Sequence, residues 1–124
     1  MTERRVVIAG GSMAPTLDIG DVALLREGAR VRCGDVAAFR SRGQVIVHRV
    51  VLVIPWRGGA RMIHRGDALG AGYGVVGASE VLGRVVAVER AAGREPMRRH
   101  VRPLDLLRAA ANLGTHLCAN QRAS

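Results

Sequence analysis

The stretch QVIVHRVVLVI, residues 44–54, is the longest apolar run of the chain, and the predicted fold class depends on it. Apolar side chains occupy both alternating positions. The stretch therefore predicts a central strand that is buried on both faces, or one long enough to be shared between two sheets. On a period of two, one face carries a histidine among apolar side chains: His48 with Ile46, Val50, Leu52 and Ile54. A polar ring on such a face needs a hydrogen-bond partner.

Shorter apolar runs on both sides of this stretch predict further strands. They cover residues 4–9, 21–27, 34–41, 60–67 and 81–89, and Gly-Asp pairs mark three of the intervening turns. Residues 73–80, YGVVGASE, are expected to form a glycine-rich loop. Several short strands separated by glycine-containing turns predict an all-β fold, either a sandwich or a barrel.

The chain changes character after this β domain, which is expected to span residues 1–90. Residues 91–103 are expected to form an arginine-rich connector. Residues 104–119 place leucine and alanine on one stripe at helical spacing, and they predict an amphipathic helix before a tail at residues 120–124. The helix is expected to dock on the β domain or on a partner protein, with a membrane surface as a further alternative.

Composition limits the function classes. The 124 residues are enough for one domain with a hydrophobic core, and 48% of them are hydrophobic, which argues against disorder. The net charge is +9, and every basic side chain except histidine is arginine. That balance fits a nucleic acid or an anionic lipid partner, but also the residue usage of a GC-rich genome. Nucleic acid is disfavoured, because only Phe39, Trp56 and Tyr73 could stack on bases.

Cysteine spacing and hydropathy exclude further classes. Cys33 and Cys118 lie far apart without CxxC spacing, so neither a zinc site nor a disulfide framework is predicted, and no cofactor is expected. No window approaches the roughly 18 apolar residues of a transmembrane helix, and no N-terminal signal is present. We therefore expect a cytoplasmic protein that meets a membrane only peripherally.

A second stretch, AGGSMAPTLDIGD at residues 9–21, places Ser12 directly after two glycines. A serine hydroxyl becomes a nucleophile only when a base accepts its proton. Lysine is absent and arginine keeps its proton, so the candidate bases are histidines. Taken alone, the serine is equally well explained as a turn residue or a helix N-cap.

The four histidines differ in their settings. His100 lies in the arginine-rich connector, and His116 lies on the polar face of the predicted helix. His48 lies in the middle of the long strand, where the Ser12 hydroxyl could supply the partner that its ring needs. His64, in MIHRGD, is interpreted as a supporting residue of the site or as an ordinary histidine at a strand end.

Five motifs follow one another across residues 6–90: GSMAPTL, GDVAAF, VIVHRVV, HRGD and VLGRVV. Together they resemble signal peptidase I in its Ser/His form, which is typical of archaeal, endoplasmic-reticulum and some Gram-positive enzymes. The wider group includes the Ser/Lys signal peptidases and the self-cleaving repressor domains. The resemblance implies a β fold, an extended peptide substrate, Ser12 as the nucleophile and His48 as the general base.

The same resemblance extends to the residues around this pair. Asp67 matches the aspartate of the later Gly-Asp box and becomes a third candidate catalytic residue. Residues of the serine box are expected to contact substrate: Gly11, Met13 and Pro15. Ser/His members usually carry a second acid a few positions after that box, and GDALGAGYGVV offers none. The base is then oriented by Asp67, by Tyr73 or by no acid at all.

The predicted function is that of a serine endopeptidase that removes a leader or signal segment from a precursor peptide. The absent second acid supports an alternative, a catalytically degenerate member that binds extended peptides without cleaving them. A basic domain that binds nucleic acid is a third hypothesis, and it rests on charge alone.

Overall fold

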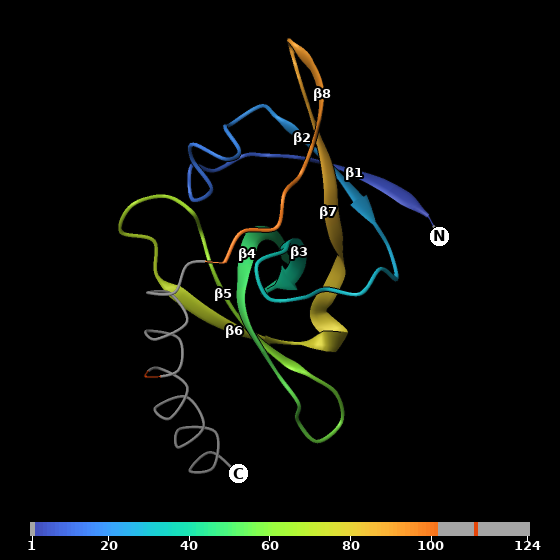
Figure 1. The fold of residues 1–124 in the computed structure, drawn as a ribbon, viewed down its shortest axis with the longest axis vertical. Helices are drawn as coiled ribbons and strands as arrows, with labels where there is room; N and C mark the ends of the chain where they lie inside the picture. Colours follow the sequence, from blue (N-terminus) through green and yellow to red (C-terminus); the bar gives the residue numbers. More distant parts are fainter. Residues whose placement is uncertain (1, 102–110, 112–124) are drawn as a thin grey trace.

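A computed structural model of the chain describes residues 2–101 and residue 111 (Figure 1). Between residues 2 and 101, eight strands and one short 3-10 helix, η1, follow one another: β1 (Glu3–Val7), β2 (Val22–Arg26), β3 (Val36–Ser41), β4 (Gln44–Ile54), β5 (Arg61–Arg65), β6 (Tyr73–Gly77), η1 (Ala78–Glu80), β7 (Val81–Arg90) and β8 (Gly93–Pro96). The predicted all-β class is therefore confirmed for this part of the chain. The helix expected over residues 104–119 and the tail after it lie outside the described residues.

The strands form one antiparallel sheet in the order β1-β2-β7-β3-β4-β5-β6. Strand β7 is its junction, because β2 pairs along one edge while β3 and then β8 share the other edge. In Figure 1 the β1–β2 end lies in the upper part of the view and β5–β6 in the lower part. Strands β1 and β6 are the two ends of the order, so hydrogen bonds among the described strands do not close it into a barrel.

Strand β4 is buried on both faces, as its sequence predicts. It lies between β3 and β5. Val47 on one face packs with Met13 in the first apolar cluster, while Val50 on the other face packs with Phe39 in the second. The core therefore lies on both sides of the sheet.

The predicted continuity of the His48 face along β4 is wrong beyond Val50. The pairing with β5 shifts between Val50 and Leu52, which leaves Val51 as the extra residue of a β-bulge. Val53 consequently packs in the cluster of Val50, whereas Leu52 and Ile54 pack with Val51. An inserted residue reverses the alternation of faces, and the hydrophobic pattern alone does not reveal it.

Two segments that were not predicted as strands are strands. Residues 73–77 form β6 instead of a loop, because pairing with β5 outweighs the low strand propensity of their glycines. Residues 93–96 form β8 within the expected connector. The side chain of Glu95 in β8 accepts a hydrogen bond from Arg90 of β7 at 2.8 Å.

The loop between β1 and β2, residues 8–21, carries Ser12 and is called the serine loop here. Two backbone hydrogen bonds close its base: the Ile8 amide donates to the Asp21 carbonyl, and the Gly20 amide donates to the Ile8 carbonyl, both at 2.8 Å. Met13 and Leu17 point inward and are 1% and 0% exposed. The hydrophobic core therefore fixes the part of the loop that follows the serine.

Within the described residues, no helix has the length and apolar character needed to cross a membrane.

Leu17→Ala is expected to lower the free energy of unfolding by about 2–5 kcal/mol, because it leaves a cavity under the serine loop. Ile19→Ala is the matched control, since Ile19 lies in the same loop and is 69% exposed. Urea unfolding followed by circular dichroism measures both variants. Equal effects of the two substitutions would contradict the anchoring role of Leu17.

Candidate active site

Ser12 and His48 meet at the surface of the sheet. Ser12 is exposed in the serine loop, and His48 is half-buried in the middle of β4. The Ser12 Oγ lies 3.1 Å from the His48 Nε2, within hydrogen-bond reach. The structure therefore brings together the two residues that the sequence identifies as candidate nucleophile and base, in the geometry that proton transfer requires.

Residues 66–68, which follow β5, contact the backbone of Ser12. The Ala68 amide donates a hydrogen bond to the Ser12 carbonyl at 2.9 Å. A Cβ atom at Gly66 would lie only 2.1 Å from that carbonyl oxygen and 3.0 Å from the Ser12 Cβ. Glycine is required at position 66 because the two backbone segments approach so closely, and not because of its φ angle.

The second ring nitrogen of His48 faces another histidine. His48 Nδ1 lies 2.9 Å from Nδ1 of His64. His64 lies in β5 opposite Val50, so it is the diagonal neighbour of His48 on the same face of the sheet. From the sequence alone His64 is interpreted as a supporting residue or an ordinary histidine at a strand end, because the bulge that sets this register leaves no sequence signal.

Burial keeps both rings neutral at neutral pH. His64 is 7% exposed, and its burial, followed by the positive charge of protonated His48, lowers the pKa of His64 to about 4. Burial also lowers the pKa of His48, while the negative charge of Asp67 acts in the opposite direction. A neutral His48 can accept a proton, as a general base must.

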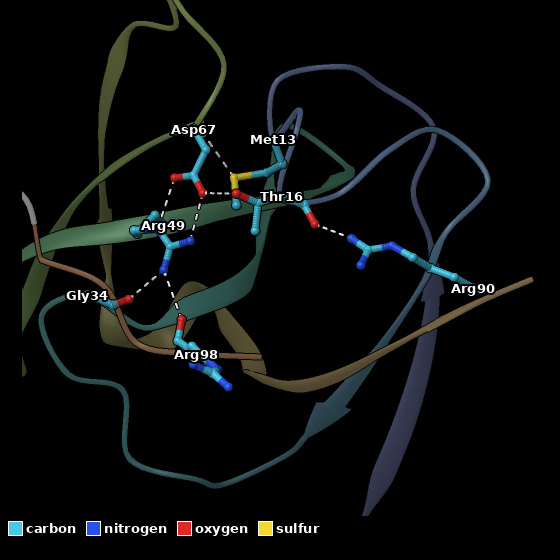
Figure 2. Close-up of polar contacts among 7 residues, drawn as sticks. All are labelled: Met13, Thr16, Gly34, Arg49, Asp67, Arg90 and Arg98. Carbon is cyan, nitrogen blue, oxygen red and sulfur yellow. Dashed lines mark hydrogen bonds and ion pairs between the residues drawn. The ribbon is translucent and has the colours of Figure 1, made fainter. Parts of the chain in front are cut away.

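Asp67 lies in a buried ion pair with Arg49 (Figure 2). The Arg49 Nε donates to Oδ1 at 2.9 Å and Nη2 donates to Oδ2 at 2.7 Å, while the Thr16 hydroxyl donates to Oδ2 at 2.6 Å. The guanidinium also donates to the carbonyls of Gly34 and Arg98. The side chains of Arg49 and Asp67 are 10% and 9% exposed.

Asp67 also contacts the serine loop and acts electrostatically on His48. Its carboxylate is engaged by Arg49 and Thr16, and its amide donates to the Met13 sulfur at 3.4 Å. Its influence on His48 is that of a nearby negative charge. Tyr73, the other expected orienting residue, lies in β6 with the Arg65 guanidinium 5.4 Å above its ring.

A groove passes Ser12 between residues 6–10 on one side and residues 45–48 on the other. Its walls are mainly apolar, and Val7 and Val45 are 65% and 49% exposed beside it. Of the residues expected to contact substrate, Met13 lines the groove, and the groove lining includes neither Gly11 nor Pro15. The sequence did not indicate that Val7 and Val45 are exposed, because both occur in apolar runs that are typical of buried strands.

Comparison of the chain with models of protein families and with curated proteins finds no match. The chemistry of the site therefore has to be judged from its own geometry. When a hydroxyl lies within reach of a neutral imidazole and beside an apolar groove, its oxygen can attack the carbonyl carbon of a bound molecule.

Asp67→Asn is expected to lower the free energy of unfolding by about 3–5 kcal/mol, because it leaves the buried Arg49 guanidinium without its counter-charge. Glu27→Gln is the control, since the Arg4–Glu27 pair is exposed and such pairs contribute little. Chemical denaturation at pH 7 gives both values. An Asp67→Asn protein as stable as the control would show that the pair does not hold the site together.

Proposed function

We propose that the protein is a serine endopeptidase of the signal peptidase I type, which removes a leader or signal segment from a precursor peptide. The observation that carries the proposal is the 3.1 Å approach of Ser12 Oγ to His48 Nε2 beside an apolar groove. The order of the serine, histidine and Gly-Asp motifs supports the same assignment, and so does an antiparallel β fold that leaves Ser12 exposed.

The reaction is an acyl transfer. His48 Nε2 accepts the proton of Ser12, and Oγ attacks the carbonyl carbon of the scissile bond to form a tetrahedral intermediate. Collapse of this intermediate leaves an acyl-enzyme, and the protonated His48 gives its proton to the departing amine. Water then hydrolyses the ester, with His48 again as the base. The backbone N–H of Ser12 is the candidate donor to the oxyanion.

The strand edges beside the groove suit an extended substrate. Among the described residues, β1 pairs only with β2, and residues 44–48 of β4 pair only with β3. Each strand therefore leaves one edge without a strand partner, and residues of both line the groove. A peptide could add to such an edge through backbone hydrogen bonds, while its apolar side chains contact Val7 and Val45.

One observation favours a second function. The His48 Nδ1 faces an imidazole, where Ser-His-Asp sites place a carboxylate. A weaker base would turn over slowly, and a protein of this kind could bind extended peptides without cleaving them. The partner is a precursor peptide in both cases, and the cytoplasmic location expected from the sequence stays a prediction.

We expect the wild-type protein to cleave, at one bond, peptides that carry an apolar segment followed by small residues. Ser12→Ala and His48→Ala should each lower the rate by about 10³-fold or more, because the nucleophile or its base is lost. Ser79→Ala and His100→Ala are matched controls outside the groove and should cleave like wild type. Mass spectrometry identifies the bond and gives the rates.

Peptide binding to Ser12→Ala, measured by fluorescence anisotropy, separates the two functions. Tight binding with no cleavage by any variant would favour the non-cleaving peptide-binding protein. Cleavage that persists in Ser12→Ala, or a wild type that neither binds nor cuts, would refute the peptidase assignment.

A further inference from the structure

We propose that His64 is the positioning residue of the site: it accepts a hydrogen bond from His48 Nδ1 and thereby holds Nε2 toward Ser12. In this arrangement a neutral imidazole occupies the place of the acid in a Ser-His-acid triad. The consequence for catalysis rests on the proposed function, whereas the hydrogen bond between the two histidines can be tested without any activity.

Packing on three sides fixes the His64 ring. Its ring centroid lies 4.8 Å from that of Phe39, with the two planes inclined at 31°. On the β6 side, a Cβ atom at Gly74 would lie 2.6 Å from both Nε2 and Cε1 of His64. The third neighbour is His48 itself, at 2.9 Å between the Nδ1 atoms. Because these contacts fix the orientation of the His64 ring, a hydrogen bond from His48 Nδ1 to His64 also fixes the orientation of the His48 ring.

The short distance between the two Nδ1 atoms allows one proton between them. If His48 Nε2 accepts the Ser12 proton, then the His48 ring must carry its own proton on Nδ1, because a neutral imidazole has one N–H and one acceptor. His64 is then the acceptor at Nδ1 and carries its proton on Nε2. The two hydrogen bonds at 2.9 Å and 3.1 Å are thus compatible with only one direction of donation when Ser12 donates.

The charges around the pair favour this state. His64 stays neutral because it is buried, and its pKa is lowered to about 4. On the β4 side Arg49 is paired with Asp67, whose charge acts on His48. On the β5 and β6 side the Arg65 guanidinium lies over the Tyr73 ring. When His48 becomes protonated during the reaction, its Nδ1–H continues to donate to His64, so the same hydrogen bond persists through the cycle.

Acid pH should break the arrangement. Protonation of His64 places a second proton between the two Nδ1 atoms, and the rings must separate. Because the pKa of His64 is lowered in the folded protein, the neutral pair is complete above the unfolded value near 6.5 and is lost as the pH falls toward 4.

Two substitutions at position 64 test the proposal. His64→Asn keeps a hydrogen-bond acceptor near the position of Nδ1, whereas His64→Leu removes the acceptor and keeps an apolar side chain against Phe39. A third variant, Gly74→Ala, pushes on the ring from the β6 side. Gly72→Ala is its control, because a Cβ atom at Gly72 would meet nothing within 4 Å. Thermal unfolding shows which variants remain folded.

The first readout is the tautomer of His48, observed by ¹⁵N NMR of the imidazole rings in the full chain at pH 7.5. We expect His48 with its proton on Nδ1 in wild type, in His64→Asn and in Gly72→Ala, and a mixture of tautomers in His64→Leu and Gly74→Ala. A wild-type His48 with its proton on Nε2, or a folded His64→Leu protein with an unchanged tautomer, would overturn the proposal.

The second readout is the rate of peptide cleavage by the same variants. His64→Leu should lower kcat by about 10²–10⁴-fold with little change in KM, and His64→Asn should recover most of that loss. A folded His64→Leu enzyme with the wild-type kcat would also overturn the positioning role. If wild type cuts no peptide, the proposed function fails, and the NMR result still decides whether His64 positions His48.

Discussion

The buried ion pair between Arg49 and Asp67 is the interaction on which the geometry of this site depends. Arg49 follows His48 in β4, and Asp67 lies between Gly66, which packs against the Ser12 carbonyl, and Ala68, whose amide donates a hydrogen bond to it. Through the Thr16 hydroxyl the same carboxylate reaches the serine loop. One pair of charges thus fixes both partners of the 3.1 Å contact. Because removing charges from water is costly, such a pair adds little net stability, but loss of one partner leaves an uncompensated buried charge.

Adjacent residues of β4 make different contacts because successive side chains of a strand point to opposite faces. His48 and Arg49 point to opposite faces. The Arg49 side chain meets Asp67, which also binds Thr16 of the serine loop, whereas the His48 side chain meets His64 and Ser12 of the same loop. The Asp67 carboxylate accepts hydrogen bonds from Arg49 and Thr16, while the ring of His64 lies against His48 Nδ1.

The sequence predicted the strands with strong hydrophobic patterns and the Ser12–His48 pair. The bounds of β4 were correct because apolar residues fill both faces between two turns. The sequence did not predict β6, whose glycines are poor strand formers. It also did not predict the bulge at Val51, which sets the register of β4 on β5. His64 comes beside His48 through that register, so its position could not follow from spacing along the chain. The ion pair of Asp67 with Arg49 was likewise not predicted, because the Gly-Asp motif does not indicate which side chain the aspartate contacts.

In the proposed mechanism, His48 activates the Ser12 hydroxyl. The most direct test of this step is covalent labelling of the full chain by a fluorophosphonate, followed by intact-mass measurement and peptide mapping. A serine activated by His48 should give one adduct, on Ser12, formed at least about 10²-fold more slowly in His48→Ala and at the wild-type rate in His100→Ala. No adduct, an adduct on another residue, or equal labelling of His48→Ala would contradict it.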